Sequence, residues 1–278
     1  MPLMKMSRNE TLGDLHTHFF KSGNILRNKN MNHLAAYAEL FPTDVKVEYD
    51  LWYDANDKNK VHGYVWTDAC NKFIYIRPAC TVRSVTLMND CATSDVTDMG
   101  RDLVRYIGQN ASDKYKSQKK VPQHDYVIFL PGTNIFKKLV DLSLLQREVK
   151  KGAIVKPHPL TAIPLRAYLE ANLPKESIAD RRLSGHGLLA GAKKVGTYTN
   201  SEMGLAALAA DKTVVIMNDV REVTTYSSIY NAISPGLKPS KERLEAMLSR
   251  KNSGIIVDCL GNAQERIDAF FAQYESYR

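Results

Sequence analysis

The spacing of apolar residues along the chain changes near residue 123, and the two parts predict different elements. After that point, short β-branched runs alternate with runs whose apolar residues recur every three or four positions. The first pattern is typical of buried strands and the second of helices with one buried face. The predicted strands are 125–130, 153–156, 194–198, 213–217 and 254–257, and the predicted helices are 133–151, 163–173, 201–210, 240–251 and 262–277. Such alternation predicts an α/β fold, with a parallel sheet covered by helices on both faces.

The first 122 residues show a different pattern. Apolar and polar residues alternate singly over 45–51, and more loosely over 82–87, which predicts strands joined by hairpins. Helices are expected within 11–40 and over 102–108. The lysine-rich stretch 111–123 has the composition of a linker. We therefore expect an N-terminal domain over 1–122, a second domain over 123–261, and a C-terminal helix over 262–278 that packs back on the first domain.

Composition and charge narrow the classes of partner. The 278 residues carry a formal net charge of +8, which favours an anionic partner such as nucleic acid, a phospholipid surface or a phosphorylated small molecule. The basic pairs Lys119-Lys120, Arg181-Arg182 and Lys193-Lys194 either bind phosphates of a polymer or lie on solvated faces. The four cysteines form no C-x-x-C motif, and no apolar run approaches the roughly 18 residues of a membrane span. A cytoplasmic protein is expected.

Three polar segments directly follow predicted strands of the second domain. Ligands of parallel sheets bind at the carboxyl ends of the strands, so the three segments together predict a pocket for a nucleotide or a diphosphate. Taken singly, each segment has a plainer interpretation as a strand terminator or a helix cap. The predicted pocket residues are Gly132, Thr133, Asn134, Lys156, His158, Thr199, Asn200, Ser201 and Glu202.

The order of these segments carries a family resemblance. A strand followed by Lys156-Pro157-His158-Pro159, and a later strand followed by 199–204, resembles the donor-binding half of GT-B glycosyltransferases. The capsule, Kdo and sialic-acid transferase branches are the most similar, and there a His-Pro histidine and serine-motif hydroxyls contact the nucleotide and phosphate of the donor. The resemblance implies these roles for His158 and Ser201, with Thr199 and Glu202 as neighbours. It covers about 125–218, and Ala207 stands where many GT-B enzymes carry a glutamate for the ribose.

The same resemblance implies an architecture and a reaction class. It implies two Rossmann-like domains in a GT-B arrangement and a metal-independent transferase. The nucleotide sugar would be a co-substrate, and no cofactor is expected. The departing nucleotide gains negative charge, which positive groups and a helix N-terminus would stabilise.

One short string near the N-terminus supports two interpretations. In 13–18, Asp14, His16 and His18 are the candidates for the general base that deprotonates the acceptor hydroxyl. The string also resembles the opening metal-ligand motif of PHP-type phosphoesterases and amidohydrolases, since His-x-His on a strand aims both imidazoles to one side. The later ligand motif of those enzymes is missing here. A metal phosphoesterase is the alternative from another enzyme class, and a surface helix with chance histidines is a third interpretation.

The acceptor is expected to be anionic because of the net charge of +8. The best match is a hydroxymethylated base in DNA, as in phage DNA glycosyltransferases, where the base must be flipped out of the duplex. A surface glycan or a glycolipid is the alternative, since anionic membranes attract the same charge. A DNA-binding protein without catalysis remains a third hypothesis.

Overall fold

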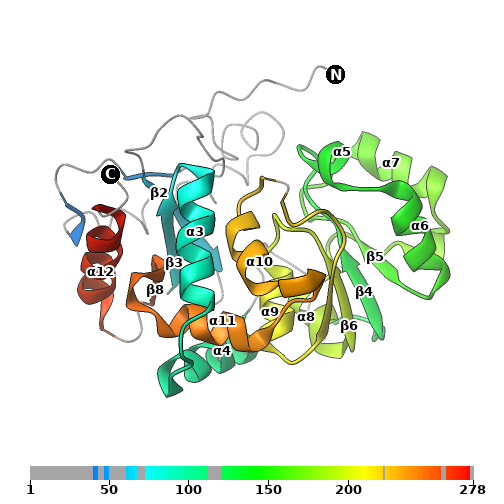
Figure 1. The fold of residues 1–278 in the computed structure, drawn as a ribbon. Helices are drawn as coiled ribbons and strands as arrows, with labels where there is room; N and C mark the ends of the chain where they lie inside the picture. The colour runs from blue at the N-terminus through cyan, green and yellow to red at the C-terminus, as the bar shows by residue number, and fades with distance from the viewer. Residues whose placement is uncertain are drawn as a thin grey trace.

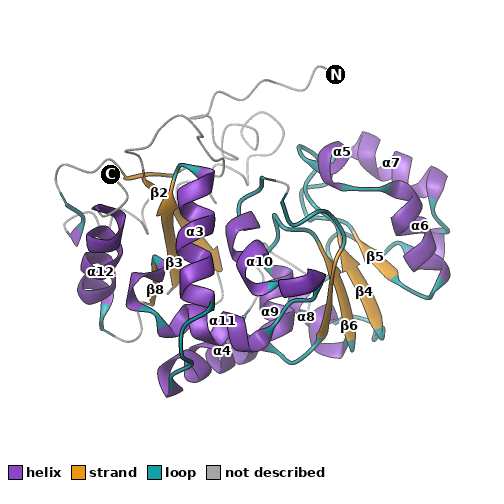
Figure 2. Ribbon diagram, in the orientation of Figure 1, coloured by secondary structure: helices purple, strands orange, loops and turns teal. Residues whose placement is uncertain are grey.

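The computed structural model describes residues 40–42, 47–49, 61–67, 73–111, 120–221, 223–257 and 261–275 (Figure 1). Within these ranges the strands form two four-stranded sheets, one in the order β5-β4-β6-β7 and the other in the order β1-β2-β3-β8. Helices lie between the sheets and around them, as the colouring by secondary structure shows (Figure 2). The described chain is therefore a mixed α/β fold.

The first sheet is parallel throughout, as the alternation of strands and helices predicts. Its strands are β4 (Tyr126–Phe129), β5 (Ile154–Lys156), β6 (Lys194–Thr197) and β7 (Thr213–Ile216). The central strand β4 pairs with β5 on one side and with β6 on the other, and β6 pairs with β7. The four predicted strands from 125 to 217 are thus confirmed.

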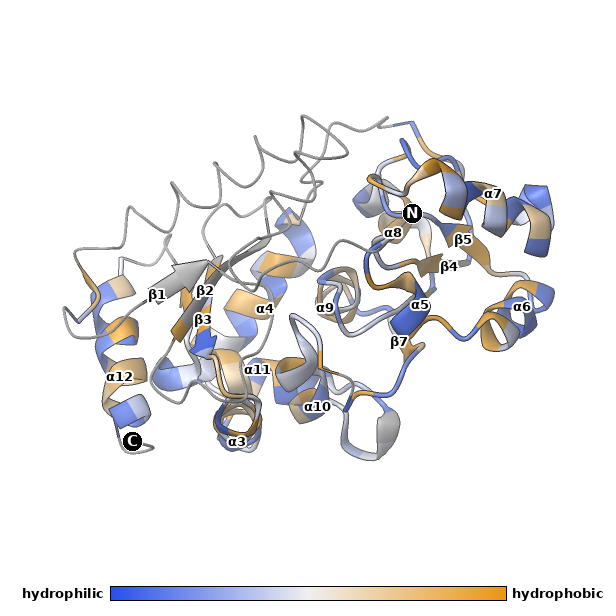
Figure 3. Cartoon of the chain, turned by 90° about the horizontal axis from the view of Figure 1, so that it is seen from above, coloured by the Kyte–Doolittle hydropathy of each residue, from blue (hydrophilic) through white to orange (hydrophobic). Residues whose placement is uncertain are grey.

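Helices cover both faces of this sheet. One face packs on α5 (Phe136–Leu139), α6 (Leu142–Lys150) and α7 (Ile163–Asn172), and the other on α8 (Gly185–Gly191) and α9 (Met203–Ala209). Successive side chains of β4 point to opposite faces, so Ile128 joins the first core and Val127 joins the second. Strands β4 and β5 are accordingly coloured as hydrophobic and lie enclosed by helices (Figure 3).

Two predictions about helices are wrong in detail. The single helix expected over 133–151 is two helices, because Asp141 interrupts it and caps the second. The Asp141 carboxylate accepts hydrogen bonds from the backbone N–H groups of Ser143 at 2.8 Å and Leu144 at 3.2 Å. The strand expected over 82–87 lies within helix α3 (Thr81–Ala92), which buries one stripe of side chains at helical spacing.

The second sheet differs from the expected pattern. Its strands are β1 (Val47–Tyr49), β2 (Val61–Thr67), β3 (Phe73–Pro78) and β8 (Ile255–Val257). Strand β8 was expected in the parallel sheet, but it pairs antiparallel with β3. Gly254 makes the entry to β8 possible, since its φ of 75° favours glycine and its carbonyl accepts a hydrogen bond from the backbone N–H of Ile76 at 2.8 Å.

Only the β1–β2 pairing of this second sheet is parallel among the described residues, whereas β2–β3 and β3–β8 are antiparallel. A Rossmann-like sheet is parallel, whereas two of the three described pairings of this sheet are antiparallel. The arrangement of two Rossmann-like domains as in GT-B enzymes stays a prediction. The hairpin pattern predicted before residue 122 is visible in the antiparallel pairing of β2 with β3.

The largest core joins the second sheet to the helices around it. It contains side chains of β3, α3, α9, α10 (Ser227–Ile233), α11 (Lys241–Ser249) and α12 (Ala263–Glu275). Helix α4 (Asp98–Asn110) approaches α9 closely, because a β-carbon at Gly108 would lie 2.6 Å from the carbonyl oxygen of Ala209. Helix α9 is buried on both sides, which explains its wholly apolar sequence after Gly204. The 3₁₀ helices are η2 (Lys175–Ser177), η3 (Pro235–Leu237) and η4 (Lys251–Ser253).

The domain boundaries at 122 and 261 stay predictions. In the part of the chain that the structure describes, every helix is too short or too polar to cross a bilayer.

Candidate functional site

The nine residues predicted to form a pocket follow the carboxyl ends of three neighbouring strands. Residues 132–134 follow β4, 156–158 end and follow β5, and 199–202 follow β6. The chain turns to one side of β4 to form β5 and then crosses to the other side to form β6. Such a reversal creates a crevice at the carboxyl edge of a parallel sheet, which is the place where these folds bind ligands. With strands about 4.8 Å apart, the loops after β5 and β6 begin about 10 Å from each other.

A direct hydrogen bond joins the first loop to the second. The hydroxyl oxygen of Thr133 accepts a hydrogen bond from the backbone N–H of Ala162 at 2.9 Å. Ala162 is the N-cap of α7, so Thr133 positions the N-terminus of that helix. The turn that presents Thr133 is closed by a bond from the N–H of Ile135 to the carbonyl of Gly132 at 3.2 Å.

His158 is held in a tight turn between β5 and α7. Its carbonyl accepts hydrogen bonds from both the N–H and the hydroxyl of Thr161, at 2.9 and 2.7 Å. Its ring Nδ1 accepts from the backbone N–H of Leu160 at 3.2 Å. Because Nδ1 accepts, the ring proton of the neutral imidazole is on Nε2, which makes Nε2 the donor of this half-buried side chain.

Lys156 is almost completely buried, with 3% of its surface exposed. Its ammonium donates to the carbonyl of Pro157 at 2.9 Å and to the carbonyl of Arg181 at 2.8 Å. The side chain therefore ties the His158 turn to the segment around residue 181. Its predicted contact with a ligand stays a prediction, and its observed contacts are those of a residue that positions two loops.

Ser201 lies just before α9 and contacts its first residue. The Ser201 hydroxyl oxygen accepts a hydrogen bond from the N–H of Met203 at 3.2 Å, so it satisfies a backbone donor at the first residue of α9, whose N-cap is Glu202. The same hydroxyl still has a proton to donate to an anion. The carbonyl of Ser201 accepts from the phenol of Tyr230 at 2.7 Å, and burial raises the pKa of that phenol, so it stays protonated as the donor.

Thr199 lies in a buried network that the sequence did not reveal. Its hydroxyl oxygen accepts from the side-chain amide of Asn218 at 2.9 Å and from the hydroxyl of Thr224 at 3.0 Å. These contacts join the loop after β6 to the loop after β7. Thr199 is fully buried. Polar residues after β7 were the available sequence signal for Asn218.

The other two residues of this loop differ in their partners. The Glu202 carboxylate accepts a hydrogen bond from the phenol of Tyr226 at 3.2 Å. The side-chain oxygen of Asn200 is buried and has no hydrogen-bond partner among the described residues. A buried acceptor without a donor is unfavourable by about 1–3 kcal/mol, so Asn200 is the residue of this loop with an unused acceptor.

The predicted catalytic residues Asp14, His16 and His18 lie outside the described residues. Their roles as a general base or as metal ligands stay predictions. In the described ranges, no group of three or more His, Cys, Asp and Glu side chains is arranged to hold a metal ion.

A pocket of about 420 Å³ lies at a different place, beside the C-terminus of α9. Helix α9 runs from the carboxyl edge of the sheet to the opposite edge, so this pocket and the loops lie at opposite ends of the helix. Its cations are compensated, since Arg101, Arg105 and Lys241 pair with Asp98, Asp102 and Asp211 on exposed surface. Exposed pairs of this kind indicate a solvated surface, and we place the candidate site at the carboxyl edge.

Comparisons with known proteins add a structural neighbour. No protein-family model matches the chain, and no curated protein matches it. Among solved structures, the chain is similar to Thermosulfurimonas dismutans KpsC, a beta Kdo 2,4 transferase, with 14% identity, coverage of 68% of this chain and 79% of that chain, and a TM-score of 0.36. A likeness this weak carries no weight for the function, which has to be inferred from the geometry of the loops.

Proposed function

We propose that this protein is a glycosyltransferase that binds a nucleotide sugar at the carboxyl edge of its parallel sheet. The observation that supports the proposal most is the convergence of 132–134, 156–158 and 199–202 on one edge, next to the reversal of strand order. These are the segments whose sequence resembles the donor-binding half of GT-B enzymes. The GT-B arrangement and independence of metal belong to the same proposal.

The chemistry assigned to the site is stabilisation of a departing nucleotide phosphate. The Nε2 proton of His158 provides a donor close to the N-terminus of α7, which carries a partial positive charge. The Ser201 hydroxyl provides a second donor from the loop after β6. Fixed donors that face the developing negative charge lower the barrier of such a step without reorganisation.

The test is a thermal-shift screen with UDP-, CMP- and GDP-linked sugars and the corresponding nucleotides. At least one is expected to raise the melting temperature of the wild-type protein. His158→Ala is expected to abolish the shift while the variant stays folded. His124→Ala is the matched control, because His124 precedes β4 at the opposite edge of the sheet, and it is expected to retain the full shift.

Two results would contradict the proposal. The absence of a shift with every nucleotide and nucleotide sugar would contradict the existence of a donor site. A shift that is equally large in His158→Ala and His124→Ala would show that binding occurs elsewhere.

The acceptor is proposed to be anionic, and the net charge of +8 is what supports this. DNA with hydroxymethylated bases remains the prediction for its identity, and a surface glycan or glycolipid remains the alternative. Transfer of a radiolabelled sugar to hydroxymethylated DNA, compared with transfer to an anionic glycan, distinguishes the two acceptors.

A further inference from the structure

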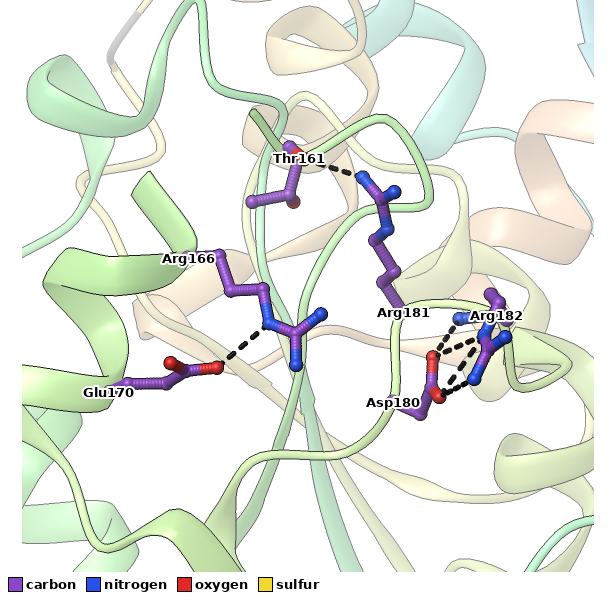
Figure 4. Close-up of polar contacts among 6 residues, drawn as sticks. All are labelled: Thr161, Arg166, Glu170, Asp180, Arg181 and Arg182. Carbon is purple, nitrogen blue, oxygen red and sulfur yellow. Dashed lines mark hydrogen bonds and ion pairs between the residues drawn. The ribbon is translucent and has the colours of Figure 1, made fainter. Parts of the chain in front are cut away.

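The segment 178–182 brings an additional arginine to the carboxyl edge. Ile178 forms a parallel bridge with Val155 of β5, and the N–H of Ala179 donates to the carbonyl of Val155 at 2.9 Å. The segment therefore runs alongside β5 in the same direction and ends beside the His158 turn. Arg181 extends from it toward Thr161 (Figure 4).

The three arginines of this region differ in their partners. Arg166 pairs with Glu170 at 2.8 Å, and Arg182 pairs with Asp180 at 2.7 Å. The hydrogen bonds from Arg182 lower the pKa of Asp180 to about 2, so this carboxylate is charged at neutral pH. Of the three guanidinium groups, that of Arg181 is thus the one without a carboxylate partner among the described residues.

Arg181 is fixed in place at both ends. Its carbonyl accepts from the buried ammonium of Lys156 at 2.8 Å, and its Nη1 donates to the carbonyl of Thr161 at 2.9 Å. A guanidinium has five N–H donors, and this is the one bond that Arg181 makes from its side chain to a described residue. The half-buried side chain is therefore ordered and keeps donors for another acceptor.

The Arg181 guanidinium lies near the N-terminus of α7, where an anion would be stabilised. Thr161 immediately precedes Ala162, the N-cap of the ten-residue helix α7. The N-terminus of a helix carries about half a positive charge, so a cation placed there is repelled and an anion is attracted. An anionic ligand beside Thr161 would satisfy both Arg181 and the helix.

We propose that Arg181 is a further residue of the donor site and donates charge-assisted hydrogen bonds to the phosphate oxygens of the nucleotide. This inference rests on the proposed function. A planar guanidinium suits phosphate because two of its N–H groups can point at two oxygens of one group.

The experiment compares Arg181→Gln with Arg182→Gln by isothermal titration calorimetry. The ligands are the nucleotide that gives the largest shift in the screen and the matching nucleoside without phosphate. Loss of a charge-assisted hydrogen bond is expected to weaken nucleotide binding about 10- to 100-fold in Arg181→Gln. Arg182→Gln is the control, since Arg182 is exposed and already paired, and its affinity is expected to stay within about twofold of wild type. Nucleoside affinity is expected to be the same in all three proteins.

Arg181→Lys tests whether the positive charge is sufficient for binding or the planar set of N–H donors is also needed. It keeps the positive charge and is expected to recover part of the affinity, and circular dichroism checks that each variant is folded. Equal nucleotide affinities in Arg181→Gln and Arg182→Gln would overturn the role of Arg181 while leaving the donor site intact. A wild-type protein that binds no nucleotide would overturn the proposed function and this inference together.

Discussion

Replacing Gly204 by alanine would place a β-carbon where two buried side chains already lie. Gly204 is in the first turn of α9, and a β-carbon there would overlap Thr197 Cγ2 and Tyr230 Oη. Both neighbours are fully buried, so neither has room to move away. The sequence pattern could equally have assigned this glycine to a ligand-binding loop. The structure instead gives it a packing role, in which it lets α9 approach β6.

The expected effect follows from two opposing terms. Overpacking a core by one carbon costs about 1–3 kcal/mol. Alanine is favoured over glycine in a helix interior by up to about 1 kcal/mol, and less in the first turn. The overlap with two rigid neighbours therefore prevails, and we expect Gly204→Ala to lower the free energy of unfolding by about 1–2 kcal/mol.

Urea denaturation followed by circular dichroism measures this difference. Gly191→Ala is the matched control, because Gly191 is also helical but a β-carbon there meets the end of the exposed Gln123 side chain, which can rotate away. The control is expected to be neutral or slightly stabilising. Equal or greater stability of Gly204→Ala relative to wild type would refute the packing explanation.

Two further predictions concern buried charges. Hydrogen bonds from Lys151 and Tyr126 outweigh burial and lower the pKa of Glu148, so its stabilisation is present above the unfolded-state pKa and disappears as pH falls. Glu148→Gln should therefore lower the free energy of unfolding by about 1–3 kcal/mol at pH 7. In urea denaturation at a series of pH values, the stability of this variant should fall less steeply toward acid pH than that of the wild type. An unchanged pH profile would contradict this. Arg266 is fully buried and donates to three backbone carbonyls. Arg266→Met should therefore lower the free energy of unfolding by about 3 kcal/mol. The same change at the exposed Arg105 should lower it only slightly. Equal losses at the two positions would be inconsistent with these contacts.

Sequence patterns predicted the four strands of the parallel sheet because the features that define each strand lie within a few neighbouring residues. The strands are short runs rich in β-branched residues, and α6 has a one-sided apolar stripe, whereas α9 is apolar on all sides after Gly204. The break at Asp141 was missed because the apolar spacing continues across it, although aspartate is a favoured cap. Helix α3 was missed because β-branched residues gave 82–87 the look of a strand, while its buried stripe depends on neighbours far away in the sequence.

The candidate site was predictable only in part. The loops that follow β4, β5 and β6 could be located from the sequence, because parallel strands end at a common edge. The partners of their side chains could not. In the sequence, Lys156 resembles a ligand-binding cation, but in the structure its ammonium donates to two backbone carbonyls. Arg181 belonged to one of several basic pairs, and the sequence did not distinguish it from the others.

By itself, the sequence determined the four strands from 125 to 217 and the polar residues that follow them, since periodicity and turn chemistry act over a few neighbouring residues. The tertiary structure alone decided that β8 leaves that sheet for β3, because strand pairing depends on where Gly254 turns the chain and on what covers the apolar residues. It also decided which arginine near the site lacks a carboxylate partner among the described residues. Arg182 finds a carboxylate two residues away, whereas the position of Arg181 beside α7 results from contacts with β5, which is more than twenty residues earlier in the chain.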